Sequence, residues 1–217
     1  MIPDMIPDMI PDALLTFLDQ GGPTLWLIAA LSVLTLALIL WKLWQLALMG
    51  AWSGAATQKA IALWTGGQPD AAMTHIAGRR SIRARLAHAA MAARLDDTLS
   101  DADAREDTTR QARADLAEAR RGLRALDLIS TIAPLLGLLG TVLGMIAAFQ
   151  TLQDAGARAD PSALAGGIWE ALLTTAAGMA VAIPAGVALS WFESITDRLQ
   201  GDMEDAATRI FIRARPR

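Results

Sequence analysis

Apolar and charged residues are collected into separate blocks along this chain rather than interleaved at helical spacing. Three stretches, 25–48, 128–152 and 163–192, are almost free of charge, and the segments between them are dense in Asp, Glu and Arg. A soluble helical protein mixes both kinds of residue in each helix, whereas a membrane protein gathers apolar residues into runs that span the bilayer. The pattern therefore predicts an all-α integral membrane protein with three transmembrane helices.

Each apolar run is long enough to cross a membrane as a helix. At about 1.5 Å per residue, roughly 20 residues cover a hydrocarbon core of about 30 Å. The first run contains one charged residue, Lys42, the second contains none, and the third contains only Glu170. Tryptophans lie near both ends of the first and third runs, as is typical of membrane–water interfaces.

Segment 49–127 is predicted to be a helical region outside the membrane. From residue 81 to 127 it contains no proline and a single glycine, Gly122, and its Ala, Arg, Glu and Leu content favours helix. We expect this helix to continue into the second span as one rod, so that long helices extend from the membrane into a helical bundle. Residues 64–69, Trp-Thr-Gly-Gly-Gln-Pro, predict a turn between shorter helices.

The distribution of Lys and Arg predicts the orientation. All of them except Lys42 and Arg158 lie in segment 49–127 or in the tail 193–217. The positive-inside rule therefore predicts that these two segments are cytoplasmic, and that segment 1–24 and the loop 153–162 lie on the other side.

The chain opens on three copies of Met-Ile-Pro-Asp, at 1–4, 5–8 and 9–12. We interpret them as a repeat expansion near the start codon, with Met5 or Met9 as alternative starts. A cleaved signal peptide is not expected, because no basic residue precedes the first apolar run and that run is too long.

The composition limits the chemistry that the chain can carry. It has no cysteine, so disulfides and thiol-based sites are absent, and its net charge of −3 does not suggest a nucleic-acid partner. We interpret His75 and His88 as solvated helix residues. We find no nucleophile–base pair, metal-ligand cluster or phosphate-binding loop, so no cofactor, no metal and no enzymatic activity are expected.

The second and third spans are rich in small residues, which let helix backbones approach closely in a membrane. The packing candidates are Gly137, Gly140, Gly144 and Gly178. Each of these spans also contains one internal proline, Pro134 or Pro184. A proline removes a helical hydrogen bond and predicts a kink, with the freed carbonyl facing protein or water.

Few polar side chains lie inside the spans, and Glu170 is the most informative of them. A carboxylate in a span is costly and usually faces a bundle interior or water. Thr174 lies one turn further along the same face. The alternative is that Glu170 is an interfacial carboxylate, since it lies only a few residues into its run.

Residues 133–144, Ala-Pro-Leu-Leu-Gly-Leu-Leu-Gly-Thr-Val-Leu-Gly, resemble the second-helix signature of the ExbB/TolQ/MotA proton-channel family. Residues 166–185, which begin Gly-Gly-Ile-Trp-Glu and end Ala-Ile-Pro-Ala, resemble the third-helix signature of the same family. MotA-type stators have four spans, so three spans favour the ExbB/TolQ branch, and the general likeness favours ExbB. The Met-Ile-Pro-Asp repeat is not part of the family pattern.

The resemblance implies a homopentamer in the bacterial inner membrane, with the N-terminus periplasmic and the C-terminus cytoplasmic. The pore would enclose the membrane helices of an ExbD-like or TolR-like partner, which carries the protonatable Asp. Thr141 and Thr175 would line the proton passage, with Glu170 and its neighbour Thr174 nearby. Through a TonB-like or TolA-like protein the complex would deliver work to the outer membrane. Two alternatives stay open: a TolQ-like subunit of the Tol-Pal envelope system, and a purely structural membrane scaffold.

Overall fold

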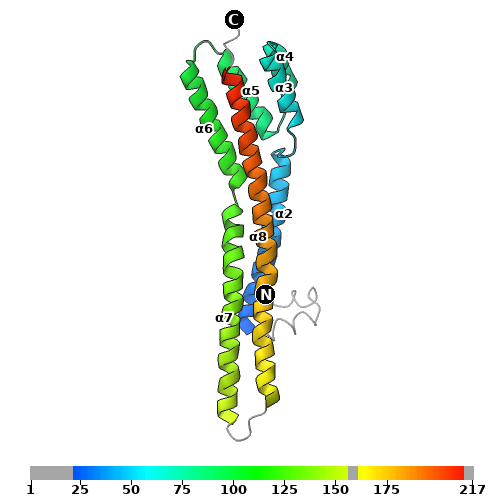
Figure 1. The fold of residues 1–217 in the computed structure, drawn as a ribbon, viewed down its shortest axis with the longest axis vertical. Helices are drawn as coiled ribbons and strands as arrows, with labels where there is room; N and C mark the ends of the chain where they lie inside the picture. The colour runs from blue at the N-terminus through cyan, green and yellow to red at the C-terminus, as the bar shows by residue number, and fades with distance from the viewer. Residues whose placement is uncertain (1–21, 156–160, 213–217) are drawn as a thin grey trace, which may run out of the picture. The chain divides into compact units, whose positions relative to one another are not determined.

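The computed structural model describes residues 22–155 and 161–212, and all regular structure in them is helical. Figure 1 shows the helices, coloured from the N-terminus to the C-terminus. Their bounds are α2 (Gly22–Leu48), α3 (Ala55–Thr65), α4 (Pro69–Ile76), α5 (Ile82–Leu95), α6 (Asp101–Arg120), α7 (Leu123–Ala155) and α8 (Pro161–Ile212). The Met-Ile-Pro-Asp repeat and Arg158 lie outside the described residues.

Three stretches of the described chain are long and apolar enough to cross a membrane: Gly22–Leu48, Asp101–Ala155 and Leu164–Ile212. In the most apolar window of each, only 22% of the residues are buried. Apolar side chains therefore cover the outer surfaces, and Val33 is 70% exposed. Apolar surface on this scale is stable in lipid and not in water. The prediction of an all-α membrane protein with three apolar helices of spanning length is confirmed.

The described residues form two compact units. The apolar unit contains residues 22–39 and 124–189 without 156–160. In this unit α7 and the first part of α8 run antiparallel, and α2 adds a third helix through Ile28. The core of this unit is made of small and branched residues: Ile28, Ile129, Ala133, Val181, Ala182 and Ala185.

The polar unit contains residues 40–123 and 190–212. Its core forms around Trp64, which is 1% exposed and whose indole N–H donates to the carbonyl oxygen of Ile210 at 3.3 Å. The turn predicted at residues 64–69 is confirmed: α3 ends at Thr65, Gly67 has a φ of +88°, and Pro69 begins α4.

The prediction of one continuous helix from residue 81 into the second span is wrong, because two breaks interrupt it. The first lies at residues 96–100. There Ser100 caps the start of α6, because its hydroxyl oxygen accepts a hydrogen bond from the backbone N–H of Asp103 at 3.1 Å. The second lies at Arg121 and Gly122, between α6 and α7. Gly122 has a φ of +85°, a conformation that favours glycine.

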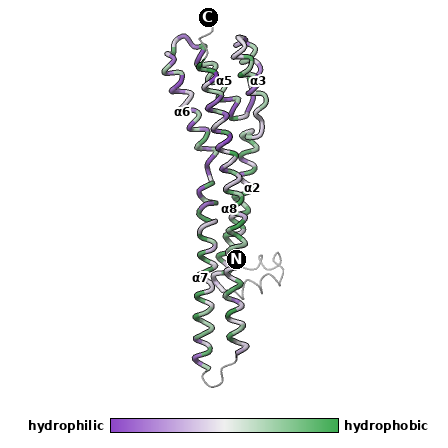
Figure 2. The backbone as a smooth tube through the Cα atoms, in the orientation of Figure 1, coloured by the Kyte–Doolittle hydropathy of each residue, from purple (hydrophilic) through white to green (hydrophobic). Residues whose placement is uncertain are grey.

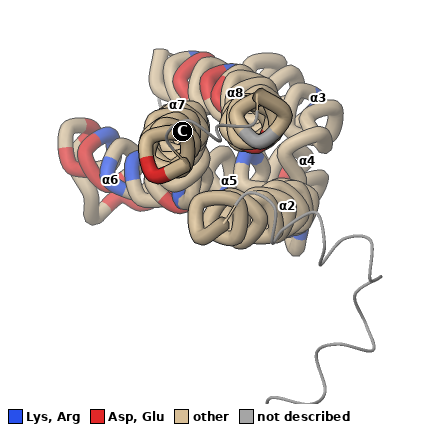
Figure 3. The backbone as a smooth tube through the Cα atoms, turned by 90° about the horizontal axis from the view of Figure 1, so that it is seen from below, with Lys and Arg blue, Asp and Glu red and all other residues tan. Residues whose placement is uncertain are grey.

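The long-helix prediction does hold for α8, which runs for 52 residues with Pro184 inside it. The two helices on either side of Gly122 differ sharply in character. In Figure 2 the tube of α7 is mostly green and that of α6 mostly purple, and Figure 3 shows acidic and basic residues along α6. A strongly polar helix thus ends where an apolar one begins.

Candidate functional site

The four glycines predicted to allow tight packing all lie where α7 meets α8 in the apolar unit. A Cβ on Gly178 would lie 2.5 Å from the carbonyl oxygen of Ala133, and a Cβ on Gly137 would lie 2.9 Å from the Cα of Thr175. These neighbours are backbone atoms, which cannot rotate away as a flexible side chain can.

Gly140 and Gly144 extend the same contact toward the other end of the helix pair. A Cβ on Gly144 would lie 2.9 Å from the Cβ of Ala171, and a Cβ on Gly140 would lie 2.7 Å from the Cβ of Thr174. Residue numbers rise along α7 as they fall along α8, which is the signature of an antiparallel pair. Small residues therefore bring the two backbones together over several turns.

Two threonine hydroxyls of α8 meet one carbonyl of α7 inside this contact. The Thr175 hydroxyl donates to the carbonyl oxygen of Gly137 at 3.0 Å. The buried Thr174 hydroxyl lies 3.2 Å from the same oxygen and 2.7 Å from the carbonyl oxygen of Ala171. A hydroxyl has one hydrogen, so the shorter distance favours the Ala171 carbonyl as the acceptor for Thr174. The Gly137 carbonyl then accepts its hydrogen bond from Thr175.

Glu170 lies one turn before Thr174 on α8, and its side chain is exposed. Among the described residues its carboxylate makes no hydrogen bond and no ion pair. Together with Thr174, Gly140 and Thr24, it lines a hollow of about 230 Å³ in the apolar unit. This position fits a carboxylate that faces a water-accessible space rather than lipid.

Thr141 is half-buried on α7, and its hydroxyl donates to the carbonyl oxygen of Leu138 in its own helix at 2.6 Å. Within the described residues it makes no hydrogen bond to Thr174 or Thr175. The structure therefore places Glu170 and Thr174 one turn apart on α8, with Thr175 next to Thr174, and leaves Thr141 on the neighbouring helix.

The two prolines lie inside continuous helices, Pro134 in α7 and Pro184 in α8. In residues 22–155 and 161–212, no group of three His, Asp or Glu side chains could hold a metal ion. Hydroxyls, backbone carbonyls and one carboxylate are thus the polar groups with which this face of α7 and α8 can act.

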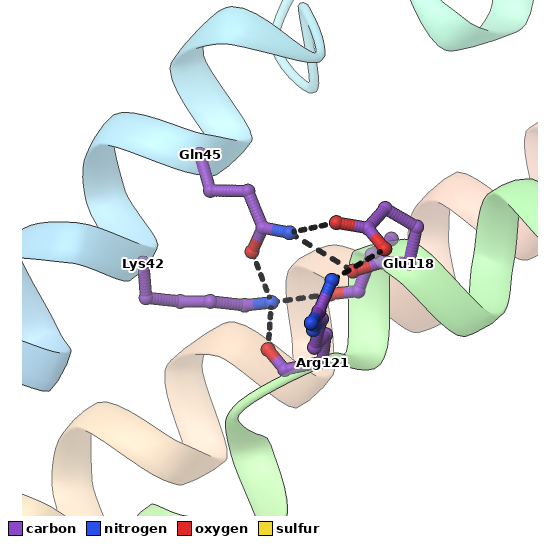
Figure 4. A network of polar contacts seen from close by, with 5 residues as sticks. Lys42, Gln45, Glu118 and Arg121 are labelled. Atoms are coloured by element: carbon purple, nitrogen blue, oxygen red, sulfur yellow. Dashed lines mark hydrogen bonds and ion pairs between the residues drawn. The ribbon is translucent and has the colours of Figure 1, made fainter.

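A second polar cluster, in the polar unit, was missed from the sequence. Lys42, near the end of α2, is 1% exposed, and its ammonium group donates to three oxygens (Figure 4). The acceptors are Oε1 of Gln45 at 2.8 Å and the carbonyl oxygens of Ala119 at 2.6 Å and Arg121 at 2.7 Å. The Gln45 amide donates in turn to the carbonyl oxygen and the carboxylate of Glu118 at 3.0 and 3.1 Å.

The Lys42 cluster closes the C-terminal end of α6. The last carbonyls of a helix have no intrahelical donor and carry the negative end of its dipole, so a buried ammonium satisfies both needs. Next to it, a Cβ on Gly122 would lie 2.7 Å from a ring carbon of Trp41. Glu170 was selected from the sequence because it is the only charged residue in its apolar run. Lys42 is likewise the only charged residue in the first run, so the same reasoning could have found it.

Comparisons with known proteins agree on a family. A sequence model of the MotA/TolQ/ExbB proton channel family matches residues 79–205. The chain is 43% identical over 83 residues to the biopolymer transport protein exbB1 of Vibrio cholerae, which is 38% of this chain and 36% of that protein. It is 52% identical over 71 residues to an ExbB-like biopolymer transport protein of Synechocystis, or 32% of this chain and 28% of that protein.

A third relative is the biopolymer transport protein ExbB of Neisseria gonorrhoeae, which is 39% identical over 92 residues. This match covers 42% of the chain and 41% of the relative. In each of these three relatives, the matched segment is thus less than half of the relative's length. The family match includes the α7–α8 glycines, the three threonines and Glu170.

Proposed function

Because this chain belongs to the MotA/TolQ/ExbB proton channel family, we propose that it is an ExbB-like subunit of a proton-driven motor in the bacterial inner membrane. It assembles as a homopentamer around the membrane helices of an ExbD-like partner and uses the proton-motive force to energise TonB-dependent transport across the outer membrane. Segments 49–127 and 193–217 face the cytoplasm.

The proposal rests above all on where α8 puts its polar groups. Glu170 and Thr174 lie one turn apart on a helix whose surroundings are otherwise apolar, and both line one hollow. Thr175 follows Thr174 directly. Polar groups at this depth are costly and are retained where they serve an ion or proton path. A helix pair that only packed would need the glycines alone.

The chemistry of these groups suits a proton rather than a metal ion. A hydroxyl both donates and accepts a hydrogen bond, so Thr175 and Thr141 can hold water in a narrow passage without a fixed charge. A proton that crosses the membrane releases about 2.3 kcal/mol per 100 mV, which is the energy available to move a partner helix.

The partner supplies what this chain lacks. In the three apolar runs Glu170 is the only acidic residue, and it lies near one end of its run. A relay across the membrane needs a second titratable group at greater depth. A single-span protein with an Asp in its membrane helix, of the ExbD type, provides that group.

The proposal is tested by complementation in bacteria that lack their own ExbB and TolQ, with the partner gene expressed alongside this chain. Two readouts separate the alternatives: growth on siderophore-bound iron for TonB-dependent transport, and detergent resistance for the Tol-Pal system. Glu170→Gln keeps the size of the side chain and removes its charge. Glu193→Gln makes the same change at another exposed position of α8 and serves as the control.

We expect the wild-type chain to restore growth on siderophore-bound iron, Glu170→Gln to fail, and Glu193→Gln to behave as wild type. Restoration of detergent resistance alone would assign the chain to the TolQ-like role. If the chain is inserted in the membrane and abundant but restores neither growth nor detergent resistance, the result would favour the structural scaffold.

A further inference from the structure

The chain around the end of α2 has a strong excess of positive charge. No Asp or Glu occurs between Asp19 and Asp70, and Asp70 is the only one between residues 40 and 95. In the same stretch, 40–95, seven basic residues occur: Lys42, Lys59, Arg79, Arg80, Arg83, Arg85 and Arg94. A basic stretch that follows a membrane helix attracts anionic lipid headgroups.

The fold brings part of this stretch against the end of α2. The turn that follows α2, residues 49–54, packs on the residues that begin α5. The backbone N–H of Ile82 donates to the carbonyl oxygen of Met49 at 3.0 Å, and a Cβ on Gly50 would lie 2.7 Å from the Cβ of Ser81. The Arg83 guanidinium also stabilises this turn, since it donates a hydrogen bond to the carbonyl oxygen of Ala51 at 2.7 Å.

Arg79 and Arg80 directly precede this contact, and both are exposed. The Arg79 Nε donates to the carbonyl oxygen of His75 at 3.1 Å, and neither guanidinium forms an ion pair with a described carboxylate. Neighbouring arginines differ: Arg83 pairs with Asp202 at 2.7 Å and Arg85 with Asp115 at 2.8 Å. Two adjacent positive charges beside the end of a membrane helix thus have no carboxylate partner among the residues that the structure describes.

Exposed aromatic rings lie in the same region. Trp44, on the last turns of α2, is 69% exposed, and Trp52, in the turn after it, is 57% exposed. Tryptophan prefers the level of the lipid headgroups, where its ring contacts acyl chains and its N–H meets water. Trp52 and the two arginines therefore combine the two kinds of contact that a phospholipid headgroup offers.

We propose that Trp52, Arg79 and Arg80, carried by the two turns joined through Met49 and Ile82, form a binding surface for the phosphate of an anionic phospholipid. A guanidinium can hold two phosphate oxygens at once, and two adjacent ones match a single headgroup. Bound lipid would hold the start of the polar unit at the membrane surface. This surface is separate from the proton path on α8.

Native mass spectrometry of the full chain tests the surface, with phosphatidylglycerol and phosphatidylcholine added in equal amounts. The double variant Arg79→Gln/Arg80→Gln is compared with Arg113→Gln/Arg198→Gln, which removes the same charge from two exposed arginines of α6 and α8. The wild-type chain should bind phosphatidylglycerol more tightly than phosphatidylcholine. The first variant should lose up to about thirty-fold of that preference, corresponding to about 1 kcal/mol per arginine, and the control should keep it.

Three results would overturn the proposal: no preference for phosphatidylglycerol in the wild type, an equal loss in both double variants, or displacement of the lipid by equimolar inorganic phosphate. Thermal unfolding of both variants in detergent verifies that they are folded. A further variant, Trp52→Ala, should weaken the binding of both lipids alike, because the ring contacts the acyl region and not the phosphate.

Discussion

Replacement of Lys42 by methionine is expected to destabilise the protein more than any surface change of the same kind. Lys42→Met keeps a long, apolar side chain and removes the ammonium group. The three oxygens that accept its hydrogen bonds, on Gln45, Ala119 and Arg121, then lose their donor. Two of these oxygens are carbonyls at the end of α6, where the helix offers no replacement.

The size of the effect follows from this geometry. A buried acceptor left without a partner costs about 1–3 kcal/mol, and two carbonyls are affected. Removal of the charge recovers part of the cost of burying an ion. The net loss is then about 2–4 kcal/mol, which in a protein of this size lowers Tm by roughly 10 °C.

The assay is thermal unfolding of the purified chain in detergent, with Lys59→Met as the matched control, because Lys59 is exposed. Lys59→Met should unfold within a degree or two of the wild type. If Lys42→Met unfolded at the same temperature as Lys59→Met, the ammonium group would not be what closes α6, and water would have to satisfy those carbonyls instead.

Three further changes probe other parts of the structure. Gly178→Ala should lower Tm by a few degrees, because its Cβ would lie 2.5 Å from a carbonyl oxygen of α7. Gly166→Ala should not lower Tm, because its Cβ would meet no atom of another helix within 4 Å. Equal effects would contradict the tight α7–α8 contact. Gly122→Ala should cost at least about 1–2 kcal/mol from its positive φ alone, and unchanged unfolding would argue against the break before α7. Burial raises the pKa of Asp115 above its ordinary value of 3.8, although a neighbouring arginine opposes the shift. Ionisation of Asp115 therefore opposes folding, and its contribution to stability is lost as pH rises through the raised pKa. The measurement is the Tm of the wild type minus the Tm of Asp115→Asn, which should fall over that pH range. A difference that rose instead would mean that the ion pair with the arginine dominates.

The apolar helices were predictable because their signal is local. Separation of apolar from charged blocks does not depend on tertiary contacts, and the turn at residues 64–69 follows from its own glycines and proline. The glycines of α7 and α8 could likewise be assigned to close packing by their spacing. What the sequence alone could not supply is their pairing, such as Gly178 with Ala133.

The break between α6 and α7 was missed for a tertiary reason. A lone Gly122 in a helix-favouring segment is compatible with a continuous helix, and only the contact with Trp41 and the Lys42 hydrogen bonds define a helix end there. The break before α6 was different, since Ser100 followed by Asp103 is a local start signal that composition outweighed. The surroundings of Glu170, too, depend on α2, whose Thr24 lines the same hollow.

Proton flux through the assembled complex is the most direct test of a proton path between α7 and α8. The chain and its single-span partner would be reconstituted into liposomes, and acidification of the interior would be followed under an imposed potential. Thr141→Val/Thr175→Val removes two hydroxyls and keeps the side-chain shape. Thr151→Val makes the same change near the end of the second apolar run, where its hydroxyl donates to the carbonyl oxygen of Ala147, and serves as the control. Flux should fall at least tenfold in the double variant and stay unchanged in the control. Undiminished flux in the double variant would contradict a proton path lined by Thr141 and Thr175.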